Sequence, residues 1–139
     1  MYKITSEQLK WAFESPACRH VYVAGDSYCA IGKFCSALLG QDVFKANLEV
    51  RGMDMALKGP PLELLKAMRD KGLKWINYSD INDSDEGSLE DNHRKALRAL
   101  FQDCIAAGIL ELEDDVAKDL YAEISMREAN PCRSVVLEN

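Results

Sequence analysis

The stretch that decides the fold is SLEDNHRKALRALFQDCIAAG, residues 88–108. Its apolar residues recur every three or four positions, the spacing of one helix face: Leu89, Ala96, Leu97, Leu100, Phe101, Cys104 and Ile105. Ser88 suits the N-cap, because its hydroxyl can accept a hydrogen bond from a backbone N–H of the first turn. Gly108 suits the position after the last turn. The pattern therefore predicts a long helix over 88–107 with one buried face, and Cys104 packing as a small hydrophobe.

Four further helices are expected around this one. Thr5 and Gln8 have the spacing of a capping box, which predicts a helix that stops before Pro16. Apolar spacing predicts a second helix over 31–39 with a single buried face, closed by Gly40. A third is expected from Pro61 to about Lys71. The last begins at Asp114 and Asp115 and is expected to bury Val116, Leu120, Tyr121 and Ile124.

A minor β element completes the expected fold. Residues 20–24 are rich in β-branched and aromatic side chains, and residues 133–137 resemble a terminal strand, so we expect the two to pair. The chain is then an α+β protein, mostly helical, with about five helices around one core in a single globular domain over 1–139. The pattern leaves two stretches open: 41–59 between a short strand and a loop, and 73–81 between a short helix and an extended segment.

Charge is distributed unevenly along the chain. The formal net charge is −6, and nearly all of the excess acid lies after residue 70. This asymmetry argues against direct binding to nucleic acid or to an anionic membrane, and it favours a partner protein with a basic surface. No apolar run approaches the ~20 residues of a membrane span. The start of the chain lacks the apolar core of a signal peptide, so we expect a cytoplasmic protein.

The stretch richest in acidic residues also contains aromatic residues. From Trp75 to Asp91 the sequence contains no Lys or Arg, so this region is a candidate binding surface. Aromatic rings would supply burial there, and carboxylates would steer a basic partner. The candidate binding residues are Trp75, Tyr78, Asp80, Asp83, Asp85 and Glu86. The leading hypothesis is a small acidic interaction module that works through 75–91, and the alternative for Trp75 is a place in the core.

Cys29 supports a second hypothesis, an enzyme. It follows a Gly-Asp-Ser turn at the start of a helix, and a helix N-terminus lowers a thiol pKa. His93 is the candidate base, although its place in the first turns of the long helix predicts a polar or boundary position. A third hypothesis is a small-ligand binder whose pocket is lined by Tyr22, Tyr28, Trp75 and Tyr78. The choice between enzyme and binding protein stays open, with binding favoured.

No cofactor or metal is expected. The two histidines and five cysteines include no pair at zinc-ligand spacing, and a disulfide framework is not expected of a cytoplasmic chain this long. Asp80, Asn82, Ser84 and Asp91 fall at ligand positions of a calcium-binding loop, but Asp85 occupies the position that requires glycine.

Two local patterns together resemble a group of small uncharacterised bacterial and phage proteins. They are Cys29-Ala30-Ile31-Gly32 at a helix start and Asn82-Asp83 ahead of a helix rich in Ala and Leu, with Trp75 between them. The resemblance implies that Cys29, Gly32, Asn82 and Asp83 are structurally coupled, and it assigns no activity. It also implies a phage or mobile-element origin, which would suit an inhibitor of a host protein with a basic surface.

Overall fold

A computed structural model describes residues 1–52 and 54–129, and this part of the chain forms seven helices and six short strands. The α+β, mostly helical fold is confirmed. The five expected helices are α1 (Ser6–Glu14), α2 (Ala30–Leu39), α4 (Gly59–Asp70), α6 (Leu89–Ala106) and α7 (Asp115–Ala129). Two short helices are added, α3 (Gln41–Ala46) and α5 (Trp75–Asn82). No helix in these described ranges is both long and apolar enough to cross a bilayer.

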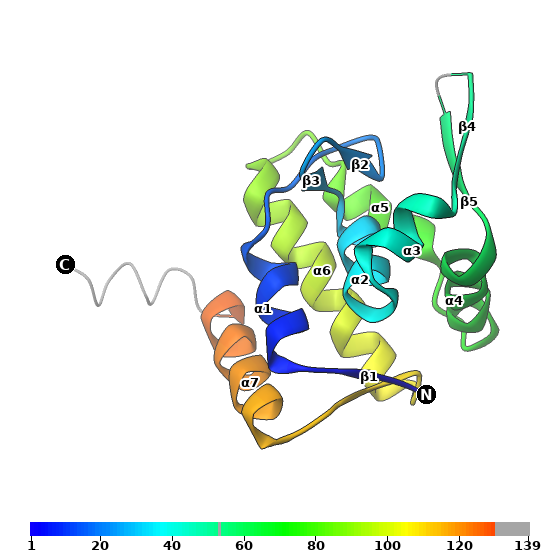
Figure 1. Cartoon of the computed structure of the whole chain (residues 1–139). Helices are drawn as coiled ribbons and strands as arrows, with labels where there is room; N and C mark the ends of the chain where they lie inside the picture. The colour runs from blue at the N-terminus through cyan, green and yellow to red at the C-terminus, as the bar shows by residue number, and fades with distance from the viewer. Residues whose placement is uncertain (53, 130–139) are drawn as a thin grey trace.

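Helix α6 crosses the middle of the molecule, and α2, α5 and α7 pack against it (Figure 1). Its predicted cap is present, since the Ser88 hydroxyl accepts a hydrogen bond from the Asp91 N–H at 3.1 Å. The capping box of α1 is also confirmed, with Thr5 and Gln8 each accepting from the other's backbone N–H. The capping side chains define both helix starts, because they accept hydrogen bonds from backbone N–H groups that have no partner within the first turn.

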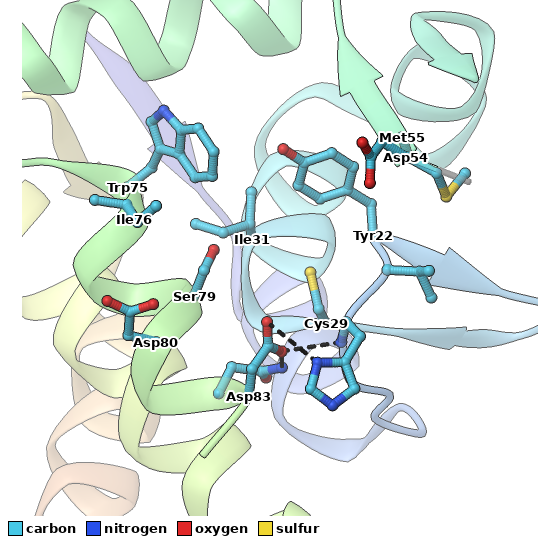
Figure 2. A pocket seen from close by; sticks show the side chains of 13 residues that line it. Tyr22, Cys29, Ile31, Asp54, Met55, Trp75, Ile76, Ser79, Asp80 and Asp83 are labelled. Carbon is cyan, nitrogen blue, oxygen red and sulfur yellow. Dashed lines mark hydrogen bonds and ion pairs between the residues drawn. The ribbon is translucent and has the colours of Figure 1, made fainter. Parts of the chain in front are cut away.

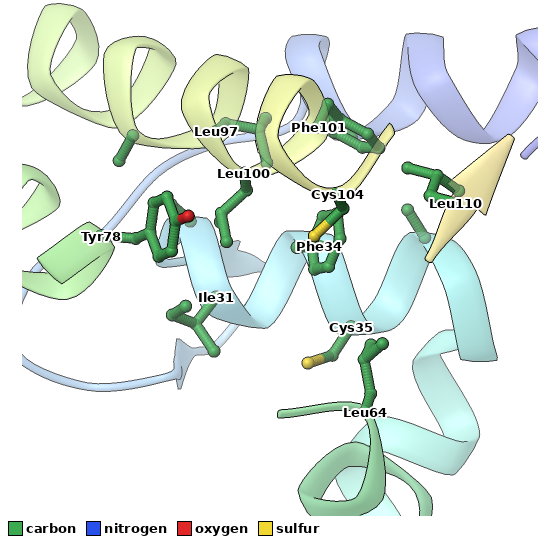
Figure 3. Close-up of a cluster of buried hydrophobic side chains, with 14 of the residues drawn as sticks. Ile31, Phe34, Cys35, Leu64, Tyr78, Leu97, Leu100, Phe101, Cys104 and Leu110 are labelled. Carbon is green, nitrogen blue, oxygen red and sulfur yellow. The ribbon is translucent and has the colours of Figure 1, made fainter. Parts of the chain in front are cut away.

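Helix α2 departs from its prediction. We expected one buried face, but every residue from Ala30 to Ala37 is buried, including Lys33 and Ser36. The reason is that α2 packs against α1, α3, α5 and α6 and so has no face left for solvent. Figure 3 shows its apolar residues Ile31, Phe34 and Cys35 among side chains of the neighbouring elements. An all-round buried helix is the centre of this core.

The strands form three separate pairs. β1 (Tyr2–Ile4) lies parallel to β6 (Leu110–Leu112), which joins the start of the chain to the segment after α6. β2 (Val23–Ala24) and β3 (Ser27–Tyr28) form a very short antiparallel hairpin. The expected partner of residues 20–24, the strand at 133–137, lies outside the described residues.

The two stretches left open by the sequence are now defined. Residues 41–59 form α3 and then an antiparallel hairpin, β4 (Leu48–Arg51) with β5 (Asp54–Leu57), which projects away from the helices (Figure 1). Residues 73–81 belong mostly to α5. One core prediction was wrong: Val116 is 64 % exposed, and Ala117 beside it is buried. The buried face of this helix contains Ala117 and Ile124, seven residues apart, and Val116 lies beside that face.

Candidate functional site

A cleft of about 310 Å³ lies beside α5, and we call it the α5 cleft. Its walls come from four places: the loop residues His20, Val21 and Tyr22; Cys29 and Ile31 at the start of α2; Asp54 and Met55 of β5; and Trp75, Ile76, Ser79, Asp80, Asn82 and Asp83 in and after α5. Figure 2 shows Tyr22 and Trp75 on facing sides of the cleft, with the Cys29 sulfur between the loop and α5. Segments far apart in sequence therefore build one concave site.

Three of the six predicted binding residues meet in this cleft: Trp75, Asp80 and Asp83. Tyr78 lies elsewhere, because it faces the core at 5 % exposure and its hydroxyl donates to Asp103 Oδ2 at 2.7 Å. Burial, followed by that carboxylate, raises the pKa of Tyr78. Trp75, Ser79 and Asp80 line the cleft from α5, whereas the Tyr78 side chain turns to Asp103 on α6.

Asp85 and Glu86 are exposed on the loop between α5 and α6, outside the lining of the α5 cleft. The loop is tied to α6 by Asn92, whose side-chain amide donates to the backbone oxygens of Ser84 and Glu86 at 3.2 and 2.6 Å. The acidic stretch is thus a hydrogen-bonded loop whose carboxylates face solvent next to the cleft.

Cys29 is the N-cap of α2, and its sulfur accepts a hydrogen bond from the Gly32 N–H at 3.4 Å. Gly32 is required there, because a Cβ at this position would overlap the Tyr22 carbonyl oxygen. That oxygen in turn accepts from the Cys29 N–H at 3.1 Å. Burial raises the pKa of the Cys29 thiol to about 12, and the Gly32 N–H offsets only part of this effect. The thiol is therefore protonated at neutral pH.

Asn82, fully buried at the end of α5, connects the floor of the cleft to three other segments. Its Oδ1 accepts from the Ala30 N–H at 3.1 Å and lies 2.8 Å from His93 Nδ1. Its amide nitrogen donates to the Cys18 carbonyl and to Asp83 Oδ1, both at 3.0 Å. The start of α2 and the end of α5 are thus in direct contact through the Ala30 N–H and the Asn82 side chain.

The network also fixes the protonation of His93. Both partners of the Asn82 amide nitrogen can only accept, so Asn82 Oδ1 faces His93 and Nδ1 of the histidine must carry the proton. The expected polar or boundary position of His93 was wrong: it is 2 % exposed. Burial, then the charges of Lys33 and Arg94, lower its pKa to about 3. His93 is therefore neutral, and its Nε2 has no partner among the described residues.

Among the described residues, no hydrogen bond joins Cys29 to His93, the candidate catalytic pair. The His93 nitrogen that faces this region is bonded to Asn82 Oδ1, and the Cys29 sulfur is bonded to Gly32. Of the four residues expected in a ligand pocket, Tyr22 and Trp75 line the cleft, whereas Tyr28 and Tyr78 are buried at 2 % and 5 % exposure. The arrangement offers aromatic and carboxylate surface and no activated nucleophile.

Asp54, Met55 and Ser79 line the cleft and were missed from sequence. Asp54 and Met55 belong to the stretch whose structure the sequence left open, and Ser79 could have been found once 75–82 was placed in a helix with Trp75. No cluster of three or more His, Cys, Asp or Glu suited to a metal ion occurs in residues 1–52 and 54–129. No protein-family model, curated protein or solved structure matches this chain.

Proposed function

We propose that this protein binds a basic segment of a partner protein by holding one arginine or lysine side chain in the α5 cleft. The observation that carries the proposal is the charge of the lining. Asp54, Asp80 and Asp83 contribute carboxylates, and the lining has no Lys or Arg within the described ranges. Carboxylates form charge-assisted hydrogen bonds with guanidinium and ammonium groups, which are stronger than neutral ones.

The aromatic and apolar walls suit the rest of such a side chain. Trp75 and Tyr22 can receive a cation over their rings, and tryptophan is the best aromatic residue for this contact. The half-exposed Ile76 offers apolar surface for the aliphatic stem of arginine or lysine. The cleft is thus complementary to both parts of a long basic side chain.

Asp85 and Glu86 have a different role in the proposal. They lie outside the cleft and would attract a basic partner over a distance, which raises the association rate more than the lifetime of the complex. The partner inferred from the resemblance is a host protein with a basic surface, met in the cytoplasm and inhibited by a phage-borne chain. Direct nucleic-acid binding is not part of the proposal, because the net charge of −6 repels phosphates.

The first prediction concerns the cleft carboxylates. In the Asp54→Asn/Asp80→Asn double variant we expect affinity for a short arginine-rich peptide to fall about tenfold or more, mainly through faster dissociation, because charge-assisted contacts are lost. Both side chains are exposed and make no hydrogen bond within the described part of the chain, so the fold should survive. Calorimetry gives the affinity, and stopped-flow fluorescence in a Trp11→Phe background reports on Trp75 alone.

The matched variant is Asp85→Asn/Glu86→Gln, which removes the same charge beside the cleft. It should slow association, strongly so at low salt, and leave dissociation nearly unchanged. If the two double variants weaken the peptide equally and through the same rate, the cleft is not the binding site. If the peptide does not bind at all while an uncharged metabolite shifts Trp75 fluorescence, the small-ligand hypothesis replaces this one.

The enzyme hypothesis receives less support. A nucleophilic thiol needs a lowered pKa or an adjacent base, and Cys29 has a raised pKa and a hydrogen bond to Gly32 in place of a base.

A further inference from the structure

A second cleft lies on another side of α2 and shares no lining residue with the α5 cleft. It has a volume of about 240 Å³, and we call it the Lys33 cleft. It is enclosed by the end of α1 and the loop that follows, by Lys33 of α2, and by Glu90, His93 and Arg94 in the first turns of α6. This volume lies below the ~300–1,000 Å³ of clefts that hold drug-sized molecules, so its occupant must be small.

Lys33 is the first unusual feature of this cleft. Its side chain is 1 % exposed, and its ammonium donates one hydrogen bond, to the Ser15 carbonyl oxygen. An ammonium group has three donors, and the described residues give Lys33 no ion pair. Burying a charge costs several kcal/mol unless it is paired. Lys33 therefore has donors left for an acceptor that the protein does not supply.

His93 is the second, independent feature. It is buried, and its Nδ1 proton is used by Asn82, so Nε2 has a bare lone pair with no partner in the described part of the chain. His93 lines the same cleft as Lys33, and after burial Lys33 is the charge that lowers the histidine pKa most. A buried acceptor without a donor is rare in native structures and calls for one. Within the described part of the chain, Lys33 thus has no anionic partner and His93 Nε2 has no donor.

The remaining charges of the lining have both signs. Arg94 adds a guanidinium, and Glu14 and Glu90 add carboxylates. A simple anion would satisfy Lys33 but leave His93 Nε2 without a donor and face two carboxylates. A simple cation would be repelled by Lys33 and Arg94. A molecule that has an anionic acceptor and a cationic donor on the same carbon atom can satisfy both Lys33 and His93.

We propose that the Lys33 cleft binds a free α-amino acid. The carboxylate of the ligand accepts hydrogen bonds from Lys33, and its ammonium donates to Nε2 of His93 and faces Glu14 and Glu90. The small volume holds the zwitterionic end and a modest side chain. This site is independent of the proposed peptide binding, because the two clefts have no lining residue in common.

The test measures binding of a panel of free amino acids to the full chain by calorimetry, beside acetate, methylamine, and the N-acetyl and methyl-ester derivatives of the best amino acid. We expect at least one amino acid to bind, and each derivative, which lacks one of the two charges, to bind about tenfold or more weakly. Acetate or methylamine binding as tightly as the amino acid would reduce the cleft to a plain ion site, and no binding by any amino acid would overturn the proposal.

Two further readouts locate the site. Lys33→Met should abolish binding, whereas Lys10→Met, which removes an exposed lysine on α1, should not change it. The ¹⁵N resonance of His93 Nε2 should move when the amino acid binds, because a lone pair that accepts a hydrogen bond is shielded differently from a bare one. Full binding by Lys33→Met, or an unmoved Nε2 resonance under saturating amino acid, would place the ligand elsewhere.

Discussion

His93 shows how a single buried residue can depend on its neighbours for its charge state. His93 is 2 % exposed, and its protonated Nδ1 donates a hydrogen bond to Asn82 Oδ1. Burial is the main cause of the low pKa, and the charges of Lys33 and Arg94 add to it. All three causes oppose a second proton on the ring. His93 therefore folds as a neutral residue, while in the unfolded chain it titrates near its ordinary pKa of 6.5.

A pH dependence of stability follows from this difference. Because the folded pKa, about 3, lies below the unfolded one, 6.5, the unfolded chain binds more protons between these values. The contribution of His93 is complete above pH 6.5 and is lost as pH falls toward 3. At pH 4 it amounts to on the order of 3 kcal/mol relative to pH 7. Urea denaturation across this range should show the loss.

The control for this prediction is the second histidine. His20 is exposed, and His20→Gln should leave the acid loss of stability unchanged. His93→Gln should lower stability at pH 7 and flatten its dependence between pH 6.5 and 4, because the titrating group is gone. An equally steep acid dependence in His93→Gln would assign the effect to carboxylates.

At the scale of the element, the hairpin β4–β5 contrasts with the helices around α6. It is a two-stranded ribbon with Val50 64 % exposed, and only its base is anchored, where Leu57 is buried and the Lys58 N–H donates to the Asn47 carbonyl. Isolated two-stranded hairpins are marginally stable in water. Since Asp54 and Met55 line the α5 cleft, one wall of that cleft belongs to this element.

We therefore predict that hydrogen exchange separates the hairpin from the core. Amides of Glu49 and Ala56 are opposite each other at a hydrogen-bonded position of the ladder, two residues along from the Lys58–Asn47 bond, and should exchange at least about a hundredfold faster than amides in α2. Peptide binding in the α5 cleft should slow exchange of Ala56, because the ligand then contacts the neighbouring Met55 on this wall. Protection of Glu49 and Ala56 equal to that of α2 in the free protein would contradict the prediction.

The elements that sequence predicted are those with strong local signals. The caps of α1 and α6 depend on residues three positions apart, and the stripe of α6 repeats for five turns. Helix α5 could not be assigned from sequence, because Lys74 supplies no side-chain cap and the apolar residues of α5 show almost no amphipathic pattern. The pairing of β1 with β6 was not predicted, because it joins residues more than a hundred positions apart. Non-local pairing leaves little trace in a single sequence.

The residues of the candidate sites were also predicted where the signal is local and missed where it depends on packing. Trp75, Asp80 and Asp83 were expected together because they are neighbours in sequence. The burial of Lys33 was missed because a stripe of Ile31, Phe34 and Cys35 predicts one buried face and leaves the lysine on the other. A signal was present: Lys33 is the one charged residue of α2, which is typical of a helix surrounded by protein.

At the scale of the whole molecule, Asn82 joins segments that no sheet connects. Through its side chain the loop at Cys18, the start of α2 at Ala30, and α6 at His93 all meet the end of α5. Asp83 extends the network by accepting a hydrogen bond from the His20 N–H at 3.0 Å. Backbone bonds of β3 already join this loop to the start of α2, since the Cys18 N–H donates to the Tyr28 carbonyl, and the Asn82 side chain adds the bonds that tie both to α5 and α6.

Replacing Asn82 should therefore cost more than a typical single substitution. In Asn82→Leu, of similar volume, the Ala30 N–H, the Cys18 carbonyl and His93 Nδ1 all lose their partner while buried or nearly so, at about 1–3 kcal/mol for each group left unsatisfied. Such penalties are not additive, and we expect a total loss of about 3–5 kcal/mol in the free energy of unfolding by urea denaturation. Asn77→Leu, exposed on the same helix, should change it by less than about 0.5 kcal/mol. Equal effects of the two substitutions would mean that apolar packing alone holds α5, the loop and α2 together.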